Sequence, residues 1–584
     1  MPPMPRQLLA LAALALVPTA SAQEFRALWA DTFHAGLRNA AEVTALVTAA
    51  RRGNCNAVVV EVRKRGDAYY RNGLEPTATD VAAGFDPLAD LVQKAHSGSP
   101  RIDVHAWMVT YNIWNNGTEP PSQPTHPYNL HPDWLTQRND GQQFDGSNYQ
   151  FDPGHPGVQE HTFAVAMDIL TRYNVDGIHF DYIRYTEHDS AINNQPWGYN
   201  PLAVSRFKTL KSRTTTPAPS DPVWLQWRRD QVTALLRKVY LHAWAAKPAA
   251  RVSAALIPWG NAPDLSLASW QSTNAYARVL QDWRGWMEEG ILDLACPMIY
   301  RNEETTPGFE EWADFAKERQ YNRAAAIGMG WYLNTVSNTI EQIKLARLPT
   351  AGGKRSVGVV GYSYAVMNRY PDPENPGGYI NNFVPRNEML DALREDAAAE
   401  TYDPGGSPVF LTSVALPAMP WKTNSMRGHL MGFVREAPGG TDIDGATLTL
   451  SGPAGRTLLT DATGFFGAVD LPVGDYTLTI SLRGFASQTR SFTVVGAQVA
   501  QLILAMAPPE LEIRSAIWNA AKTHLTLVWA SVPGKEYNIE YSTNLLGWIP
   551  LVSVTGSEQE TTSYELAIAA ASATRRFFRV KLAE

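Results

Sequence analysis

A cluster of polar side chains ends the apolar run that begins at Val175. Asp181, Tyr182 and Arg184 stand at its far end. An unpaired carboxylate in a hydrophobic core is costly or has a shifted pKa, so buried carboxylates belong to ion pairs or active sites. Because side chains alternate along a strand, His179 and Asp181 share one face. The run therefore predicts a buried strand that ends at a polar pocket.

Polar and aromatic side chains also follow the other strands that the sequence predicts. Carboxylates occur at Asp31, Glu61 and Glu303. Indole and phenol rings stack on sugar faces while their N–H and O–H groups donate hydrogen bonds. Such a set suits a polyhydroxylated substrate. The candidate substrate contacts are Asp31, Arg63, Trp107, Tyr111, Asn112, His179, Arg184, Trp259, Tyr300, Trp331 and Tyr364.

Several of these residues also have a purely structural explanation. An ion pair between Glu61 and Arg63 inside a barrel would account for both. His179 would lie deep enough to be a satisfied core histidine. Glu303 would be a solvated loop carboxylate. Asp181 lies at the exit of its strand, where a functional role is favoured.

The elements that position these side chains alternate between strand and helix from about residue 25 to 400. Apolar strands separated by helices indicate a parallel sheet covered on its outside. Eight such units fit a (β/α)8 TIM-type barrel with its active site at the carboxyl ends of the strands. A doubly wound open sheet is the alternative, although no Gly-rich phosphate loop follows the first strand. The predicted strands are Arg26–Ala30, Ala57–Arg63, Val104–Thr110, the run from Val175 to Asp181, Arg251–Ile257, Leu294–Tyr300, Ala324–Tyr332 and Val357–Tyr364. The predicted helices include Ala40–Arg52, Pro87–His96, Gly157–Tyr173, Pro222–Ala245, Ala275–Glu289, Phe309–Arg319, Thr339–Ala346 and Arg386–Glu395.

The composition changes beyond the barrel, which we place at residues 23–400. A Pro/Gly-rich linker at 401–424 leads to two stretches of short alternating strands, 425–507 and 508–584. The turns Asp461-Ala-Thr-Gly-Phe-Phe466 and Leu471-Pro-Val-Gly-Asp-Tyr476 make the first stretch resemble a carboxypeptidase regulatory-like β-sandwich. The second is similar to a small fibronectin-type module. Neither contains a catalytic cluster, so we expect spacers or modules that dock to a cell surface or cell wall.

The overall composition excludes some classes of function. The net charge is −7 and no basic patch stands out, so nucleic acid is not an expected partner. No His, Asp and Glu group has metal-ligand spacing, and no Gly-x-Ser-x-Gly elbow occurs. We therefore expect neither a metal nor a cofactor, and not a serine hydrolase.

The amino terminus predicts export. Arg6, an apolar run and the small residues Ala20-Ser21-Ala22 are typical of a signal peptide over residues 1–22, with the mature chain starting near Gln23. No later stretch is long and apolar enough to be a transmembrane segment. A periplasmic or secreted protein is expected. The two cysteines, Cys55 and Cys296, are associated with different predicted strands, the second and the sixth, and are expected to be buried free thiols.

A series of motifs resembles the glycosyl hydrolase-like family 10 barrel. It comprises Arg26-Ala-Leu-Trp29, Val60-Glu-Val-Arg63 with Gly66-Asp67-Ala-Tyr69, Phe85-Asp-Pro-Leu88, His105-Ala-Trp107, Val175-Asp-Gly-Ile-His-Phe-Asp-Tyr-Ile-Arg-Tyr185 and the stretch from Trp283 to Tyr300. The family often has Asp-Asp-Tyr where this chain has a single Asp181 before Tyr182. The resemblance implies action on glycans, and one branch of the family cleaves the glycan strands of peptidoglycan.

These observations lead to the hypothesis of an exported glycoside hydrolase with two catalytic carboxylates. Asp181 would be one, and Glu61 or Glu303 the other. Arg63 and Arg184 would lower the pKa of Asp181 and keep it ionised, so the acid would be a more desolvated carboxylate. A non-catalytic glycan-binding surface protein, and a glycan lyase or transglycosidase, remain alternatives.

Overall fold

The computed structural model describes residues 23–583, apart from 189–190, 192, 303–305, 307, 372–378, 381–385, 438–439, 508–510, 533, 558, 560 and 569–574. The predicted signal peptide and Glu303 lie outside the described residues. None of the helices in the described part of the chain combines the length and apolar composition needed to span a membrane.

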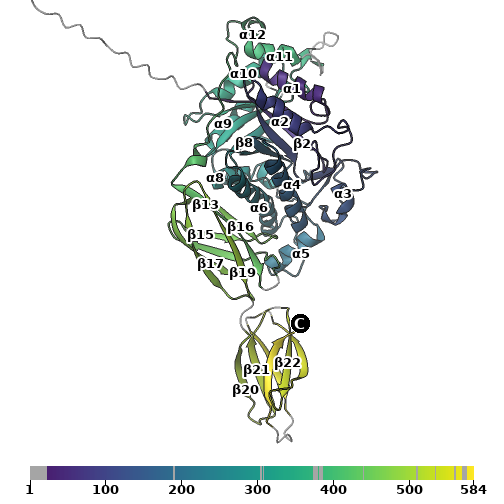
Figure 1. The fold of residues 1–584 in the computed structure, drawn as a ribbon, viewed down its shortest axis with the longest axis vertical. Coiled ribbons are helices and arrows are strands. Elements are labelled where there is room, and N and C mark those ends of the chain that lie inside the picture. The colour runs from purple at the N-terminus through teal and green to yellow at the C-terminus, as the bar shows by residue number, and fades with distance from the viewer. Residues whose placement is uncertain are drawn as a thin grey trace, which may run out of the picture.

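Eight parallel strands close into a barrel, which confirms the predicted (β/α)8 fold over the open sheet (Figure 1). Every residue of these strands is buried except Met298 and Tyr362. Burial on both faces explains why the strands are nearly continuous apolar runs. In order around the barrel they are β1 (Phe25–Ala30), β2 (Ala57–Arg63), β3 (Asp103–Val109), β6 (Gly177–Asp181), β7 (Arg251–Leu256), β8 (Leu294–Ile299), β9 (Ala324–Gly330) and β10 (Gly358–Tyr362), which pairs with β1.

Helices cover the outside of the barrel, and their ends follow the capping residues in the sequence. Asp86 caps α2 by accepting a hydrogen bond from the Ala89 N–H, with Pro87 in the first turn. The main helices are α1 (Ala40–Arg52), α2 (Pro87–Ser97), α4 (Pro156–Arg172), α6 (Pro222–Ala246), α8 (Trp283–Glu289), α9 (Phe309–Glu318), α10 (Val336–Arg347) and α11 (Arg386–Arg394).

One predicted helix is wrong. The stretch Ala275–Glu289 is a π-helical turn over Asn274–Arg278 followed, after a break, by α8. Leu280 lies in the break with a φ of 56°, which a continuing right-handed helix does not allow. The Asp282 carboxylate then caps α8 by accepting from the Gly285 N–H.

Long loops at the carboxyl ends of the strands carry short elements. These are β4 (Asn112–Trp114), α3 (Pro127–Leu130), η1 (Pro132–Trp134), β5 (Tyr149–Gln150), α5 (Pro201–Leu210), α7 (Leu267–Gln271), η3 (Trp331–Leu333), β11 (Tyr370–Pro371) and β12 (Tyr379–Ile380). The helix α12 (Asp396–Tyr402) follows α11.

The segment after α12 packs back onto the barrel. In η4 (Pro420–Thr423), the Trp421 indole donates to Asp293 Oδ1 at 2.6 Å, and Lys422 Nζ lies 3.0 Å from Asp293 Oδ2. Asp293 is fully buried. Arg251 donates to the Pro417 carbonyl at 2.9 Å. This stretch of the predicted linker therefore satisfies a buried charge of the barrel.

Two β modules follow. The first packs against α6, where the Trp244 indole donates to the Ala497 carbonyl at 3.1 Å and Lys238 Nζ lies 3.0 Å from Thr463 Oγ1. Figure 1 shows the second module beyond the first, at the end of the molecule away from the barrel. The first module contains β13 (Arg427–Glu436), β14 (Thr447–Ser451), β15 (Arg456–Leu459), β16 (Phe465–Pro472), β17 (Gly474–Ser481), β18 (Gln488–Val494) and β19 (Val499–Met506), in sheets β16-β13-β19 and β15-β14-β17-β18. The second contains β20 (Ile513–Trp518), β21 (His524–Ala530), β22 (Glu536–Ser542), β23 (Ile549–Thr555), β24 (Thr561–Ala567) and β25 (Phe577–Leu582), in sheets β20-β21-β24 and β23-β22-β25.

Candidate active site

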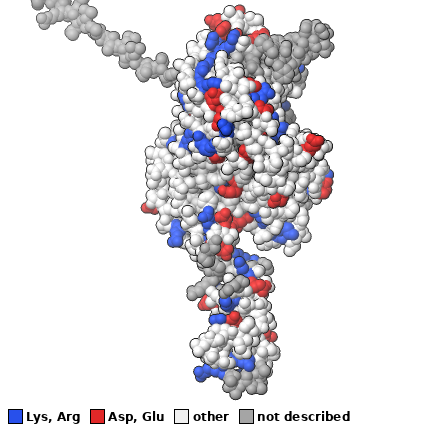
Figure 2. Space-filling model, turned by 45° about the vertical axis from the view of Figure 1, so that its right-hand side comes forward, with Lys and Arg blue, Asp and Glu red and all other residues white. Residues whose placement is uncertain are grey.

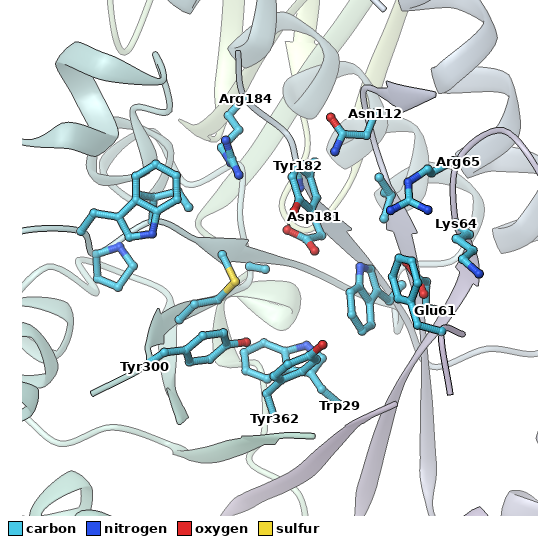
Figure 3. Close-up of a pocket in the computed structure, with 18 of the residues that line it drawn as sticks. Trp29, Glu61, Lys64, Arg65, Asn112, Asp181, Tyr182, Arg184, Tyr300 and Tyr362 are labelled. Carbon is cyan, nitrogen blue, oxygen red and sulfur yellow. Dashed lines mark hydrogen bonds between the residues drawn. The ribbon is translucent and has the colours of Figure 1, made fainter. Parts of the chain in front are cut away.

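A pocket of about 400 Å³ opens at the carboxyl ends of the barrel strands. Asp181 stands near its centre, with Glu61 and Tyr300 on two sides (Figure 3). Barrel enzymes place their catalytic groups at this end of the strands. The lining residues are Trp29, Phe33, Glu61, Lys64, Arg65, Trp107, Val109, Asn112, Asp181, Tyr182, Arg184, Ala255, Ile257, Pro258, Trp259, Gly260, Met298, Tyr300, Arg301 and Tyr362.

Asp181 is the last residue of β6, and the residue after it holds its carboxylate. Tyr182 has a φ of 49° and donates its backbone N–H to Asp181 Oδ1 at 2.7 Å. Such a backbone conformation is uncommon for a residue other than glycine and is found at functional sites. Burial raises the pKa of Asp181 to about 6, although the Tyr182 N–H, the Arg184 charge and the Trp107 indole favour the ionised form. The prediction of a lowered pKa is therefore wrong, because desolvation outweighs the cation.

Glu61 is held in a similar way from the end of β1. The backbone N–H and the hydroxyl of Thr32 both donate to Glu61 Oε2, the first at 2.8 Å. Glu61 is 1% exposed. Burial raises its pKa to about 7; the Thr32 hydrogen bonds and Lys64 oppose this, and the negative charge of Asp31 adds to it. Glu61 is thus a carboxyl that carries a proton near neutral pH.

Arg63 does not lie in the pocket, although it is two residues after Glu61. The pairing of β2 with β3 shifts register between the two, so that Glu61 pairs with Trp107 and Arg63 with Met108. This irregularity breaks the alternation that would put both side chains on one face. Arg63 instead forms a fully buried ion pair with Glu75, with both nitrogen–oxygen distances at 2.7 Å. The predictions that Arg63 would approach Asp181 or pair with Glu61 are both wrong.

His179 lies beneath the pocket. Its Nε2 accepts from the Trp29 indole at 3.1 Å, and its Nδ1 lies 2.9 Å from the Ser253 hydroxyl. Burial holds the pKa of His179 well below its usual range, so the ring is neutral. Its partner Trp29 lines the pocket, so His179 positions a wall residue.

Asp31 does not line the pocket, but it contacts Phe33 and Tyr362, which do. Its Oδ1 accepts from the Phe33 and His34 backbone N–H groups at 3.0 and 3.1 Å. The Tyr362 hydroxyl lies 3.4 Å from Asp31 Oδ2, and the Tyr362 ring stacks on Tyr300 with centroids 5.5 Å apart. Asp31 therefore orients Phe33 and Tyr362, two residues of the pocket wall.

The remaining predicted contacts fall into two groups. Trp107, Asn112, Arg184, Trp259 and Tyr300 line the pocket. Tyr111, Trp331 and Tyr364, at most 2% exposed, are core residues that do not reach it. The indole of Trp331, for example, packs against Gly361 of β10. A Cβ atom at position 361 would lie only 2.3 Å from this ring.

The sequence reasoning missed several pocket residues. Lys64 and Arg65 follow directly after β2, and both cations lie over the Phe33 ring, at 4.4 and 4.7 Å from its centroid. The run Arg63-Lys64-Arg65 at a strand exit was the available signal. Among the described residues there is no group of three or more His, Cys, Asp or Glu side chains that could hold a metal ion. Cys55 and Cys296 are buried free thiols, as predicted.

Comparison with known proteins places this site in a family. The family model of glycosyl hydrolase-like 10 matches residues 24–344, more than half of the chain. The chain belongs to the glycosyl hydrolase-like 10 family. The carboxypeptidase regulatory-like domain model matches residues 429–507. The resemblances of the barrel and of the first β module are therefore confirmed, and the fibronectin-type resemblance of the second module stays a prediction.

Curated relatives of this glycosyl hydrolase-like 10 protein are named glycosyl hydrolases. The chain is 22% identical over 395 residues to glycosyl hydrolase YngK of Bacillus subtilis, covering 63% of this chain and 66% of that protein. It is 28% identical over 269 residues to glycosyl hydrolase DigH of Escherichia coli, covering 43% of this chain and 55% of that protein. The chain thus spans less than two thirds of the length of either relative.

The comparison with solved structures finds a glycoside hydrolase domain. The PgaB (BpsB) glycoside hydrolase domain from Bordetella bronchiseptica aligns with a TM-score of 0.43 and 13% identity, over 68% of this chain and 100% of that domain.

Proposed function

We propose that this protein is a glycoside hydrolase in which Glu61 and Asp181 are the two catalytic carboxyl groups. The observation that carries the proposal is that both are buried at strand ends, line one pocket and have raised pKa values. Hydrolysis of a glycosidic bond needs a proton donor and an ionised carboxylate at the same bond. Membership of the glycosyl hydrolase-like 10 family supports this class of reaction.

The two carboxyls suit different roles. Glu61 has the higher pKa, about 7, and would protonate the leaving oxygen as general acid. Asp181, with a pKa of about 6 and the Arg184 charge nearby, would be ionised more readily. It would then attack the anomeric carbon or activate a water.

The hydrogen bonds leave each carboxyl free to react. Glu61 Oε2 is held by Thr32 and Asp181 Oδ1 by Tyr182. In the part of the chain that the structure describes, no residue donates a hydrogen bond of normal geometry to the second oxygen of either carboxyl. One oxygen would thus fix the orientation while the other meets the substrate.

The pKa of the Tyr362 phenol indicates that the carboxyl groups of Asp31, Glu61 and Asp181 lie close to one another. After burial, the negative charges of Asp31, Glu61 and Asp181 all raise its pKa, so all three act on one hydroxyl. Tyr300 is half-buried beside Tyr362, and Asp181 also raises its pKa. These two phenols would donate hydrogen bonds within the carboxylate cluster.

The aromatic walls would bind the sugar rings. Trp29, Trp107 and Trp259 contribute indole surface around Asp181, and Asn112 adds an amide. We propose an exported protein acting on a polysaccharide, with peptidoglycan glycan strands as the first substrate to test. The β modules, which contribute no lining residue, would dock the protein to a surface.

The test is release of new reducing ends from peptide-free peptidoglycan strands and from a panel of neutral polysaccharides. Wild-type protein should release them from at least one polymer, and Glu61→Gln should reduce the rate by about 10²- to 10⁴-fold. Lys94→Gln, on the outer helix α2, is the control and should match wild type. Binding without any turnover would favour a non-catalytic glycan-binding protein. Unsaturated or transferred products would identify a lyase or transglycosidase.

A further inference from the structure

We propose that the pocket selects glycans whose sugars carry carboxylate groups, bound by Arg184 on one side of Asp181 and by Lys64 and Arg65 on the other. This inference rests on the proposed function and names the class of its substrate. Figure 3 shows the two cationic groups on different sides of the Asp181 carboxylate.

The pocket has more cations than anions. Lys64, Arg65, Arg184 and Arg301 line it, against Glu61 and Asp181. The chain as a whole has a net charge of −7, and both signs are mixed over the barrel on the face shown in Figure 2. A cleft lined mainly by one sign of charge raises the local concentration of the opposite sign.

Arg184 is a buried cation that forms no ion pair within the described residues, although its charge acts on Asp181. It is 8% exposed, and its guanidinium lies over the rings of Tyr182 and Trp259, 4.7 and 5.0 Å from their centroids. The Nε atom of Arg184 is buried and finds no hydrogen-bond acceptor among the described residues. No carboxylate of the described residues forms an ion pair with its guanidinium.

Other buried guanidinium groups of this chain have acceptors in the protein, which are carboxylates or carbonyls, such as the Gln195 and Trp197 carbonyls for Arg228. Arg206 lies 2.8 Å from Asp444, and the fully buried Arg63 lies 2.7 Å from Glu75. Burying a charge without hydrogen-bond partners costs free energy, so a guanidinium that lies between two rings and has no acceptor among the described residues indicates a partner that arrives with the substrate. A planar guanidinium fits a carboxylate with two parallel hydrogen bonds.

Lys64 and Arg65 form the second cationic group. Both lie over Phe33, and burial lowers the pKa of Arg65, although Glu61 and Tyr182 oppose this. No carboxylate in the described ranges forms an ion pair with either side chain. Lys64 Nζ only approaches the Thr32 carbonyl, at 3.4 Å. Because the two groups flank Asp181, acidic sugars are expected on both sides of the cleaved bond.

Arg301 has a different position. Its guanidinium donates to the Gly260 carbonyl at 2.5 Å and approaches the Pro258 carbonyl at 3.5 Å. These contacts hold the loop after β7 against the end of β8. We therefore assign carboxylate recognition to the other three cations.

The experiment compares each polymer with its own neutral form. The probes are peptide-free peptidoglycan strands and polygalacturonate, each with free carboxylates and after chemical reduction of the carboxylates to alcohols. Binding is measured by affinity electrophoresis, and cleavage by reducing ends. For at least one polymer, wild-type protein should bind and cleave the carboxylate form at least tenfold better than the reduced form.

The variants locate the recognition. Arg184→Gln and the double variant Lys64→Gln with Arg65→Gln should each weaken binding of the carboxylate form at least tenfold and binding of the reduced form less than threefold. Arg184→Lys keeps the charge without the planar fork and should fall between. Lys94→Gln is the matched loss of one positive charge and should behave as wild type, and unchanged melting temperatures confirm folding.

The outcomes separate this inference from the proposed function. Cleavage of both forms at similar rates would overturn the selection of carboxylates and leave hydrolysis standing. Tenfold tighter binding of the carboxylate form without cleavage of any polymer would support the selection and contradict hydrolysis. Binding of no carboxylate polymer would overturn the inference.

Discussion

Thr32 donates two hydrogen bonds to a single oxygen of Glu61, one from its backbone N–H and one from its hydroxyl. Thr32 is the second residue after the end of β1, and Glu61 lies in the neighbouring strand β2. The pair therefore fixes one oxygen of the carboxyl at the junction of two barrel strands. Without these hydrogen bonds, burial would raise the pKa of Glu61 further.

Glu61→Gln should stabilise the protein at pH 8. The pKa of Glu61 is raised from 4.5 to about 7 by folding, so the folded state binds more protons between these values. The free energy of unfolding then falls as pH rises through this window. Gln has the same shape and no charge, and its oxygen can accept from Thr32.

Urea unfolding measures this effect at two pH values. At pH 8 the free energy of unfolding of Glu61→Gln should exceed that of wild type by about 1–3 kcal/mol, and at pH 4 the two should be similar. Equal destabilisation of the variant at both pH values would contradict the raised pKa.

The barrel could be predicted from the sequence because its strands are buried on both faces. The predicted strand Ala57–Arg63 has the bounds that the structure shows. A continuous apolar run such as Ala-Val-Val-Val indicates a buried strand whichever strands pair with it. The helix predicted over Ala275–Glu289 failed at Leu280, whose positive φ is set by packing in the folded chain. Apolar periodicity carries no information on such a break.

The site was predicted less completely, because part of it depends on strand pairing, which packing in the folded chain determines. Strand exits identify Asp181 and Glu61, because position along a parallel strand determines which end of the barrel a residue reaches. The register shift after Glu61, which removes Arg63 from the pocket, depends on how β2 and β3 pair. The partner of Arg63, Glu75, lies in a loop and follows no periodic pattern.

The pH dependence of kcat/KM should report both carboxyls. In the proposed mechanism, Asp181 is ionised and Glu61 is protonated in the active form, so the profile should be a bell with limbs near pH 6 and 7. Arg184→Gln removes a charge that favours ionised Asp181, so the acid limb should move to higher pH. Lys64→Gln removes a charge that favours ionised Glu61, so the basic limb should also move to higher pH. The substrate used carries no carboxylates, so that its binding to Arg184 or Lys64 does not affect the pH profile. Limbs that stay at the same pH in both variants would contradict these assignments.

Truncation after residue 424 should give a more stable barrel than truncation after residue 400. The longer chain keeps Trp421 and Lys422 on the buried Asp293. Burial alone would raise the pKa of Asp293, but Lys422 and the hydrogen bonds hold it below its ordinary value. Removing the partners of a buried charge costs about 3–5 kcal/mol. Thermal melts should show the difference, and Asp293→Asn in the shorter chain should recover part of it.

The β modules should be dispensable for turnover of a small soluble oligosaccharide. No residue that lines the pocket comes from them. Deleting residues 425–584 should change kcat/KM by less than tenfold, under about 1.4 kcal/mol. The melting temperature should fall, because Trp244 and Lys238 lose partners in the first module. A larger loss of turnover would show that a module contributes to the active site.

The most direct test of the central claim is the release of reducing ends by Asp181→Asn. Asn keeps the shape of the side chain and can still accept a hydrogen bond from Tyr182, but it cannot ionise. The variant should melt and bind glycan as wild type does, while turnover falls by at least a factor of 10². Turnover close to that of wild type would exclude Asp181 from the reaction and contradict the two-carboxylate mechanism.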